Sequence, residues 1–318
     1  MSASCISIHV EEFLSMRAAL GFEVEHHGWL LRDFARYAEN ADHRGALTIE
    51  LAVDWAMSPC AGDTARGERR LGAVRQFARH RQAFEPETQV PPVGFIGQIP
   101  RHRPPPHIYS DAEIAALLCE CGRLRPQGGL RPKTYRAFFS LLASTGLRLS
   151  EARHLECRDV DLGDGVLLIR ESKFRKTRFV PLHSSAAQGL SRYAAERDAH
   201  PGVPDSELFF RAEQTPMLRR AAIQKTFSRL RERLAWSSSG RARSPRIHDL
   251  RHTFAVRRLV RWYEEGVDVD CKLLALATYL GHAKITEMYW YLSAVPELLA
   301  VTATRFEHFA QGEEGGTS

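Results

Sequence analysis

Hydrophobic residues recur every three or four positions over most of the chain, which predicts a protein built mainly from α-helices. Before residue 96 this pattern predicts four short amphipathic helices, within Val10–Leu20, Trp29–Tyr37, Leu47–Trp55 and Leu71–Phe84. Four helices of this length would form a small bundle around one core. The bundle by itself indicates no function.

After residue 107 the helical pattern returns and is interrupted once. Ser110 followed by Glu113 matches a capping box and predicts a helix start. A second helix would end at Gly146, and Ser150 would cap the next. Residues 166–169 and 179–180 are apolar and flank a polar stretch, so we expect a β-hairpin there. Further helices are predicted at about 184–199, 218–236, 248–263, 270–280 and 284–309.

The segment Ile99–His107, IPRHRPPPH, divides these two helical regions. Consecutive prolines cannot lie inside a helix or a central strand, so the segment predicts an extended linker. A chain of 318 residues is also long enough for two domains. We therefore expect a domain over 1–98, a basic linker over 99–107, a second domain over 108–310 and a disordered tail over 311–318.

The charge of the chain favours a nucleic-acid partner. The formal net charge is +6, and residues 211–261 hold 14 Lys and Arg against three acidic residues. Such a one-sided stretch is typical of a surface that binds polyphosphate. The sequence has no run of 18 apolar residues and no basic-then-apolar leader, so we expect a cytoplasmic protein without a membrane span. Its six cysteines include no CxxC pair, which indicates reduced thiols rather than disulfides or a metal site.

The common motifs for nucleotide or metal chemistry are missing from the sequence. There is no P-loop, GxGxxG, HExxH or GxSxG motif, and no acidic cluster for a metal. We therefore expect an enzyme of this sequence to work without a cofactor.

A set of basic residues and one tyrosine remains as candidate chemistry. Arg148 follows a predicted helix end, and Lys173 lies in the predicted hairpin turn. His248 and Arg251 lie three residues apart on one later helix. His282 follows a Leu-Gly pair, and Tyr291 comes nine residues after it. Each of them alone has an ordinary explanation, such as a capping arginine, a solvated lysine or a core tyrosine.

Taken together, these elements resemble the tyrosine recombinase, or phage integrase-type, family. Thr-Gly-Leu-Arg-Leu-Ser-Glu, the hairpin lysine, His-Asp-Leu-Arg-His-Thr-Phe-Ala, Leu-Gly-His and the following tyrosine occur in that family's order and spacing over about residues 108–295. The preceding bundle resembles the family's core-binding domain. The sequence around Tyr291 is most similar to transposon-associated members. The resemblance implies a mainly α fold with a small antiparallel β-sheet, arranged as a two-domain DNA clamp.

The resemblance also implies the reaction and a role for each residue. Tyr291 would attack a DNA phosphodiester, forming a 3′-phosphotyrosyl link and releasing a 5′-OH. Arg148 and Arg251 would bind the phosphoryl oxygens, which guanidinium groups can do bidentately. His248 and His282 would donate further hydrogen bonds, with His248 also a candidate base for the phenol. Lys173 would protonate the leaving oxygen, and Glu151 would orient His248 or the arginine.

Three of these assignments have a rival nearby in the sequence. Tyr289 competes with Tyr291, and because residues two apart on a helix point about 200° apart, only one can face the phosphate. Lys176 competes with Lys173, and His252 with His248. The family spacing favours Tyr291, Lys173 and His248.

The partners follow less directly. Basic residues outside the chemistry are candidate phosphate contacts: Arg101, Arg103, Arg241, Arg243 and Arg246. The apolar face predicted for Ala294–Phe309 packs either on its own core or, as the resemblance implies, on a neighbour in a tetramer on double-stranded DNA. We expect a prokaryotic, nucleoid-associated recombinase that integrates, excises or transposes a mobile element. The alternatives are an architectural DNA-binding relative without catalysis and a type IB topoisomerase-like enzyme.

Overall fold

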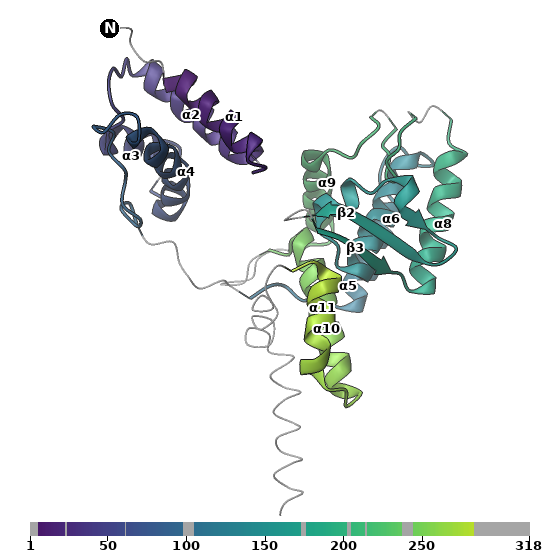
Figure 1. The fold of residues 1–318 in the computed structure, drawn as a ribbon. Coiled ribbons are helices and arrows are strands. Elements are labelled where there is room, and N and C mark those ends of the chain that lie inside the picture. The colour runs from purple at the N-terminus through teal and green to yellow at the C-terminus, as the bar shows by residue number, and fades with distance from the viewer. Residues whose placement is uncertain are drawn as a thin grey trace, which may run out of the picture. The chain divides into compact units, whose positions relative to one another are not determined.

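The computed structural model describes residues 6–22, 24–60, 62–97, 105–172, 176–201, 205–213, 215–236 and 244–282. The chain divides into two compact units, Met1–Arg103 and Pro104–Ser318 (Figure 1). Within the described residues, no helix is both long and apolar enough to cross a membrane. The fold is mainly helical with one small antiparallel sheet, as the sequence predicts.

Four helices form the first unit: α1 (Ile6–Ala19), α2 (Glu25–Asn40), α3 (Ile49–Met57) and α4 (Thr64–Gln82). Side-chain caps mark two of the starts, because Thr48 accepts a hydrogen bond from the Leu51 amide and Asp63 accepts one from the Arg66 amide. The apolar faces meet in one core, where the rings of Phe34 and Trp55 pack edge to face with centroids 5.4 Å apart. The four helices agree with those predicted from the hydrophobic pattern.

A buried ion pair fixes the chain that leaves α4. The Glu68 carboxylate accepts hydrogen bonds from the Arg75 guanidinium at 2.7 Å and from the backbone amide of Gly94 at 2.9 Å. Arg75 also donates to the carbonyls of Pro91 and Pro92. Segment 91–94, which precedes the basic linker, is therefore held against the bundle.

The second unit contains seven helices and three strands among its described residues. They are α5 (Asp111–Gly122), α6 (Leu130–Thr145), α7 (Leu149–Arg153), β1 (Val160–Asp161), β2 (Val166–Ser172), β3 (Lys176–Pro181), α8 (Ser184–Asp198), α9 (Arg220–Arg233), α10 (Ile247–Glu264) and α11 (Val269–Leu280), with a 3₁₀ turn at Cys157–Asp159. Helix α6 is the centre of the unit, because it packs against α5, α8 and α10. Its Phe138 and Phe139 are fully buried.

The sheet has the order β1-β2-β3, with antiparallel neighbours. Leu167 pairs with Val180 and Ile169 with Arg178 in the β2–β3 register, and all four side chains are buried. Phe179, between the two buried positions of β3, is 70% exposed. Side chains alternate between faces along a strand, so Arg178 points into the protein with Val180.

Two local predictions are corrected by the structure. Ser150 was expected to cap a helix, but the N-cap residue of α7 is Arg148, two residues earlier, and the helix starts at Leu149. The Glu151 carboxylate accepts a hydrogen bond of 2.9 Å from the backbone amide of Arg148, so it takes the place of a serine cap. The short strand β1 has no counterpart in the prediction, because two residues are too few to show an alternating pattern. The predicted helix at 284–309 lies outside the described residues.

Candidate active site

Arg148 occupies the sharp turn between α6 and α7. Helix α6 ends at Gly146, which adopts φ +64°, a left-handed conformation that favours glycine. A Cβ atom on Gly146 would lie 2.8 Å from Cδ1 of Phe254, so both the backbone conformation and the packing require glycine. Arg148 follows in extended conformation, and its side chain binds the carbonyl of Gly281, beyond the end of α11.

Glu151 holds the Arg148 side chain. Its Oε1 accepts a hydrogen bond of 2.8 Å from Nη1 of Arg148, while its Oε2 accepts the Arg148 amide. Burial alone would raise the pKa of Glu151, but hydrogen bonds and charge from Arg178 and Arg148 outweigh it and lower the pKa to about 2. Glu151 is therefore a carboxylate at neutral pH, and its bonds orient an arginine, one of the two partners expected for it.

Arg178 is a member of this cluster that the sequence analysis missed. From strand β3 it donates two hydrogen bonds to Glu151, from Nη1 at 3.1 Å and from Nη2 at 2.9 Å. Its Nε donates to the carbonyl of Tyr279 at 2.7 Å. The signal in the sequence was that Arg178 stands two residues before the apolar Val180, so that both side chains lie on the same, buried face of the strand.

Arg251 enters the same region from α10. It is 3% exposed, and it donates to the carbonyl of Gly146 at 2.8 Å and to that of Leu280 at 2.7 Å. These carbonyls belong to the C-terminal ends of α6 and α11, where helix dipoles place negative partial charge. Arg251 thus joins three helices at one point.

The turn after α11 is the meeting place of all three arginines. Gly281 has φ +69°, and its carbonyl accepts a 2.6 Å hydrogen bond from Nη2 of Arg148. A Cβ atom at this position would lie 2.8 Å from Nη1 of Arg178 and 3.2 Å from Nη1 of Arg148. The Leu-Gly-His sequence therefore needs its glycine both for the turn and for room beside two guanidinium groups.

The two candidate histidines have different surroundings. Burial, followed by the charges of Arg251 and Arg148, lowers the pKa of His282 to about 3. His282 is consequently neutral at pH 7, with one ring N–H to donate. His248 is exposed on the first turn of α10, and its ring packs edge to face on that of the buried His252, with centroids 4.7 Å apart. The charge of His248 also contributes to the lowered pKa of His282.

The structure therefore brings Arg148, Glu151, Arg251, His248 and His282 into one region. Arg246 lies at the start of α10, where its guanidinium donates a hydrogen bond of 2.8 Å to the Asp249 carboxylate. The remaining candidates lie outside the described residues, except Lys176, of which only the backbone is described. They are Arg101, Arg103, Lys173, Lys176, Arg241, Arg243, Tyr289 and Tyr291.

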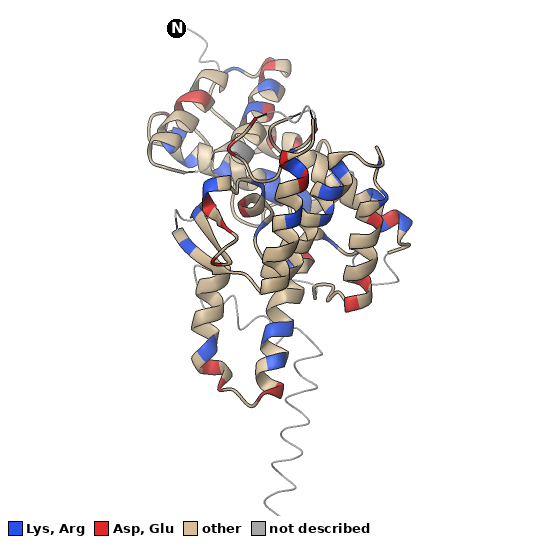
Figure 2. Ribbon diagram, turned by 90° about the vertical axis from the view of Figure 1, so that its right-hand side faces the viewer, with Lys and Arg blue, Asp and Glu red and all other residues tan. Residues whose placement is uncertain are grey.

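Helix α9 presents basic side chains that were not singled out from the sequence. Lys225, Arg229 and Arg233 are exposed and follow one another at intervals of four residues, so they lie on one face of the helix. Figure 2 shows Lys and Arg in blue over the described part of the chain. The sequence signal was the excess of basic residues over 211–261, which does not by itself separate exposed from buried members.

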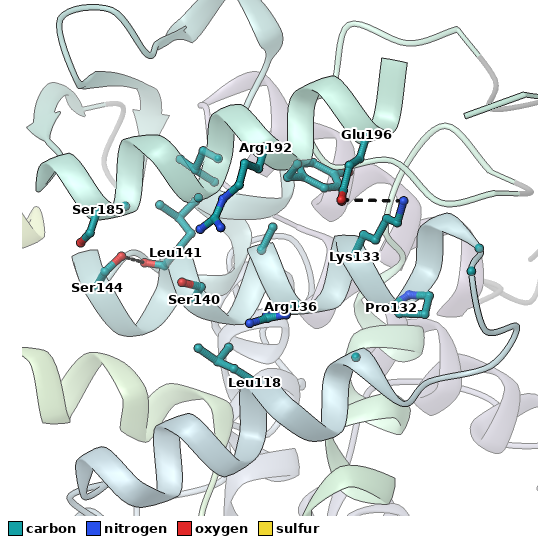
Figure 3. Close-up of a pocket in the computed structure, with 18 residues that line it drawn as sticks. Leu118, Pro132, Lys133, Arg136, Ser140, Leu141, Ser144, Ser185, Arg192 and Glu196 are labelled. Atoms are coloured by element: carbon teal, nitrogen blue, oxygen red, sulfur yellow. Dashed lines mark hydrogen bonds and ion pairs between the residues drawn. The ribbon is translucent and has the colours of Figure 1, made fainter. Parts of the chain in front are cut away.

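A hollow of about 480 Å³ lies elsewhere in the second unit, between α5, α6 and α8 (Figure 3). Lys133 and Glu196 pair across it at 3.9 Å, and Arg136 and Arg192 also line it. None of the residues around the Gly281 turn lines this hollow. In the described part of the chain, no group of three His, Cys, Asp or Glu residues could hold a metal ion.

Known proteins match both the sequence and the fold. Residues 112–297 match the phage integrase family. An integrase/recombinase of Sinorhizobium fredii, y4rB, is 39% identical over 304 residues, covering 94% of this chain and 96% of its own. The tyrosine recombinase XerD of Brucella suis is 32% identical, covering 92% of this chain and 94% of its own.

Two solved structures share the fold at low sequence identity. The integrase of the Tn1549 transposon, in complex with transposon right end DNA, superposes with a TM-score of 0.63 at 16% identity, covering 95% of this chain and 99% of that one. XerH recombinase bound to the palindromic difH substrate superposes with a TM-score of 0.62 at 20% identity, covering 96% of this chain and 86% of that one.

The second unit, which contains the arginine cluster, also holds the residues that match the family model. The chain belongs to the phage integrase family of tyrosine recombinases, which cleave and rejoin DNA in site-specific recombination. The architectural and topoisomerase-like alternatives are not favoured, because the matched relatives are recombinases and integrases.

Proposed function

We propose that this recombinase cleaves DNA with Tyr291 and uses Arg148, Arg251, His248, His282 and Lys173 to stabilise and protonate the reacting groups. The observation that carries the proposal is the convergence of Arg148 and Arg251 on the Leu280–Gly281 turn, directly before His282. The biological reaction is integration, excision or transposition of a mobile element in a prokaryotic cytoplasm. Two similarities support this setting: the Sinorhizobium fredii relative is named as an integrase/recombinase, and the Tn1549 transposon integrase shares the fold.

The two arginines act on the scissile phosphodiester. Negative charge builds on the non-bridging oxygens as the phosphorus becomes five-coordinate, and prepositioned guanidinium groups stabilise that charge. The bonds that orient Arg148 use one N–H on Nη1 and one on Nη2. A guanidinium has five N–H donors, so the same geometry that fixes Arg148 leaves donors for a phosphate.

Proton transfers accompany the bond changes. The Tyr291 oxygen forms a bond to phosphorus, its proton passes to His248, and the bond from phosphorus to the 5′ oxygen breaks. Lys173 gives a proton to that oxygen, leaving a free 5′-OH. His282, neutral because of its lowered pKa, donates its ring N–H to a phosphoryl oxygen. One phosphate ester replaces another, so the step needs no ATP.

The test is covalent trapping on a nicked suicide duplex cut from the ends of the element that carries the gene. Wild-type protein, Tyr291→Phe and Tyr289→Phe are compared on a denaturing gel. We expect a shifted band with wild type and Tyr289→Phe and none with Tyr291→Phe. A band that disappears only with Tyr289→Phe contradicts the assignment of the nucleophile, and no band with any protein contradicts cleavage of this DNA.

DNA binding is proposed to use both units. Residues 1–98 would form the core-binding domain and residues 108–310 the catalytic domain. Residues 99–107 would form a linker that follows the phosphate backbone of the DNA. Phosphate contacts are assigned to Arg101, Arg103, Arg241, Arg243 and Arg246 and to the exposed basic face of α9. Such contacts set position rather than sequence preference.

Assembly into a tetramer on DNA is proposed to use residues 294–309 in trans. The apolar positions Leu298, Leu299, Val301 and Phe306 support this, because an apolar helix face needs a packing partner. A chain that ends at Ser293 keeps Tyr291 and tests the idea by light scattering of the DNA complex. We expect loss of the tetramer with retained binding to one site, whereas a persistent tetramer contradicts the trans arrangement.

A further inference from the structure

Glu151 is shared by two arginines in a closed arrangement of hydrogen bonds. Oε1 accepts from Nη1 of Arg148 at 2.8 Å and from Nη1 of Arg178 at 3.1 Å. Oε2 accepts from the amide of Arg148 and from Nη2 of Arg178, both at 2.9 Å. Each carboxylate oxygen thus binds both residues, and four donors fix its orientation.

The cluster is buried enough for its charges to matter. The side chains of Glu151 and Arg178 are 4% and 7% exposed, and that of Arg148 is 19% exposed. Removing one member of a buried ion pair leaves an uncompensated charge, which is strongly unfavourable. Arg148 and Glu151 alone would sum to zero charge, whereas the three residues together sum to +1.

Arg178 also binds the turn that carries His282. Its Nε donates to the Tyr279 carbonyl near the end of α11, and its guanidinium lies against Gly281. Strand β3, from which it projects, begins at Lys176, directly after residues 173–175 of the hairpin. One side chain therefore connects strand β3 of the hairpin, the carboxylate that holds Arg148 and the end of α11.

We propose that Arg178 is a positioning residue for DNA cleavage. By binding Glu151 opposite Arg148, it fixes the direction of the Arg148 guanidinium and leaves the group of Arg148, Glu151 and Arg178, counted without Arg251, with one net positive charge for the scissile phosphodiester. Arg178 acts through Glu151 and does not touch the DNA. The proposal rests on the role proposed above for Arg148.

If Arg178 acts through the net charge of this group, charge-changing variants should behave differently from variants at a merely structural residue. Arg178→Gln changes the sum from +1 to 0, and Glu151→Gln changes it to +2. The double variant Arg178→Gln/Glu151→Gln returns it to +1 and leaves no carboxylate short of a partner. We therefore expect the second substitution to restore part of the activity that the first removes, instead of adding to the loss.

The test measures single-turnover adduct formation on the nicked suicide duplex, together with affinity for the same duplex and thermal unfolding. We expect Arg178→Gln to cleave about 10²-fold more slowly, similar to the loss of one transition-state donor, with affinity within about threefold of wild type. The double variant is expected to cleave at least about tenfold faster than Arg178→Gln. Arg178→Lys, which keeps charge but lacks the two-pronged geometry, is expected to be about tenfold slower than wild type.

Several outcomes overturn the proposal. It is wrong if Arg178→Gln cleaves within about threefold of wild type, or if the double variant is no faster than Arg178→Gln. If Arg178→Gln does not fold, the other variants decide: wild-type rates for both Arg178→Lys and the double variant overturn the proposal, and a slow Arg178→Lys supports it.

Wild type and Arg148→Ala, run in parallel, separate this proposal from the function on which it rests. No adduct with wild type, or wild-type cleavage by Arg148→Ala, refutes the proposed function or the role of Arg148. A competent wild type and an inactive Arg148→Ala, beside an unaffected Arg178→Gln, refute the role of Arg178 alone.

Discussion

Arg148 donates a 2.6 Å hydrogen bond to the carbonyl of Gly281, which lies 133 positions further along the chain. The bond joins the turn after α6 to the turn after α11, and Arg251 makes the same connection from α10 through Gly146 and Leu280. Three helix ends are thereby locked into one arrangement of cationic donors. Catalysis by electrostatic preorganisation requires such fixed donors, because they need no rearrangement when charge develops.

The first prediction concerns the donor geometry of Arg148. Arg148→Lys keeps the charge but loses the fork that binds Glu151 and Gly281 together, so we expect cleavage to slow by about 10²–10³-fold. Single-turnover cleavage of the suicide duplex measures this, with binding expected to stay within about threefold. Arg192→Lys, in the separate hollow beside α8, is the matched control and should cleave like wild type. Equal losses in the two variants would show that the effect is not specific to the cluster.

Gly281 should be intolerant of a side chain. Gly281→Ala combines an unfavourable φ of +69° with a Cβ atom 2.8 Å from the Arg178 guanidinium. We expect a loss of unfolding free energy of about 2 kcal/mol and slower cleavage. Gly165→Ala is the control, since Gly165 has φ +66° but its nearest neighbour is 3.7 Å away. Its cost should be about 1 kcal/mol, with unchanged cleavage. The account of this turn fails if the two variants behave alike.

The lowered pKa of His282 predicts a stability change in mild acid. The folded-state pKa of about 3 lies below the value of about 6.5 for an unfolded histidine. Below pH 6.5 the unfolded chain therefore binds the additional proton, so this contribution is complete above pH 6.5 and is lost as the pH falls toward 3. From pH 6.5 to 5.5 the loss is about 1 kcal/mol.

Urea unfolding of wild type and His282→Gln at these two pH values tests the prediction. The loss between pH 6.5 and 5.5 should be smaller by that amount in His282→Gln. An identical loss in both proteins would mean that His282 titrates normally when folded. Glu151, with its pKa near 2, contributes a separate loss only as the pH falls from about 4.5 toward 2.

The basic face of α9 predicts a salt-dependent effect on binding. Lys225→Gln and Arg229→Gln should each weaken DNA binding similarly for all sequences, because phosphate contacts carry no base information. Each should also reduce the slope of log K against log salt concentration by about 0.9. Fluorescence anisotropy at several salt concentrations measures both. Arg158→Gln, an exposed arginine paired with Glu156, should leave the slope unchanged. An unaltered slope in the α9 variants would remove that helix from the interface.

Local features of the fold were predictable because local chemistry determines them. The capping box of Ser110 and Glu113 and the glycine that ends α6 are both present as predicted. The start of α7 was misplaced because the Glu151 side chain, held by two arginines, supplies the cap in place of Ser150. A cap of this kind depends on packing as well as on residue type.

The sequence predicted only those members of the candidate site that stand in short recognisable motifs. Arg148, Arg251 and His282 stand in recognisable short motifs, and the structure places them together. Arg178 has no such motif, since its partner Glu151 is 27 positions away and the pairing depends on how the sheet docks on α7 and α11. Its inward register on β3 becomes evident only once the strand pairing is known.

We propose above that the arginine cluster serves the formation of a covalent bond between DNA and Tyr291. The most direct measurement is to purify the protein–DNA adduct from the suicide duplex, digest both components and identify the nucleotide-bearing peptide by mass spectrometry. We expect a phosphotyrosyl modification on Tyr291, joined to the 3′ side of the cleaved strand. Modification of Tyr289, or attachment through a 5′ phosphate, would contradict it.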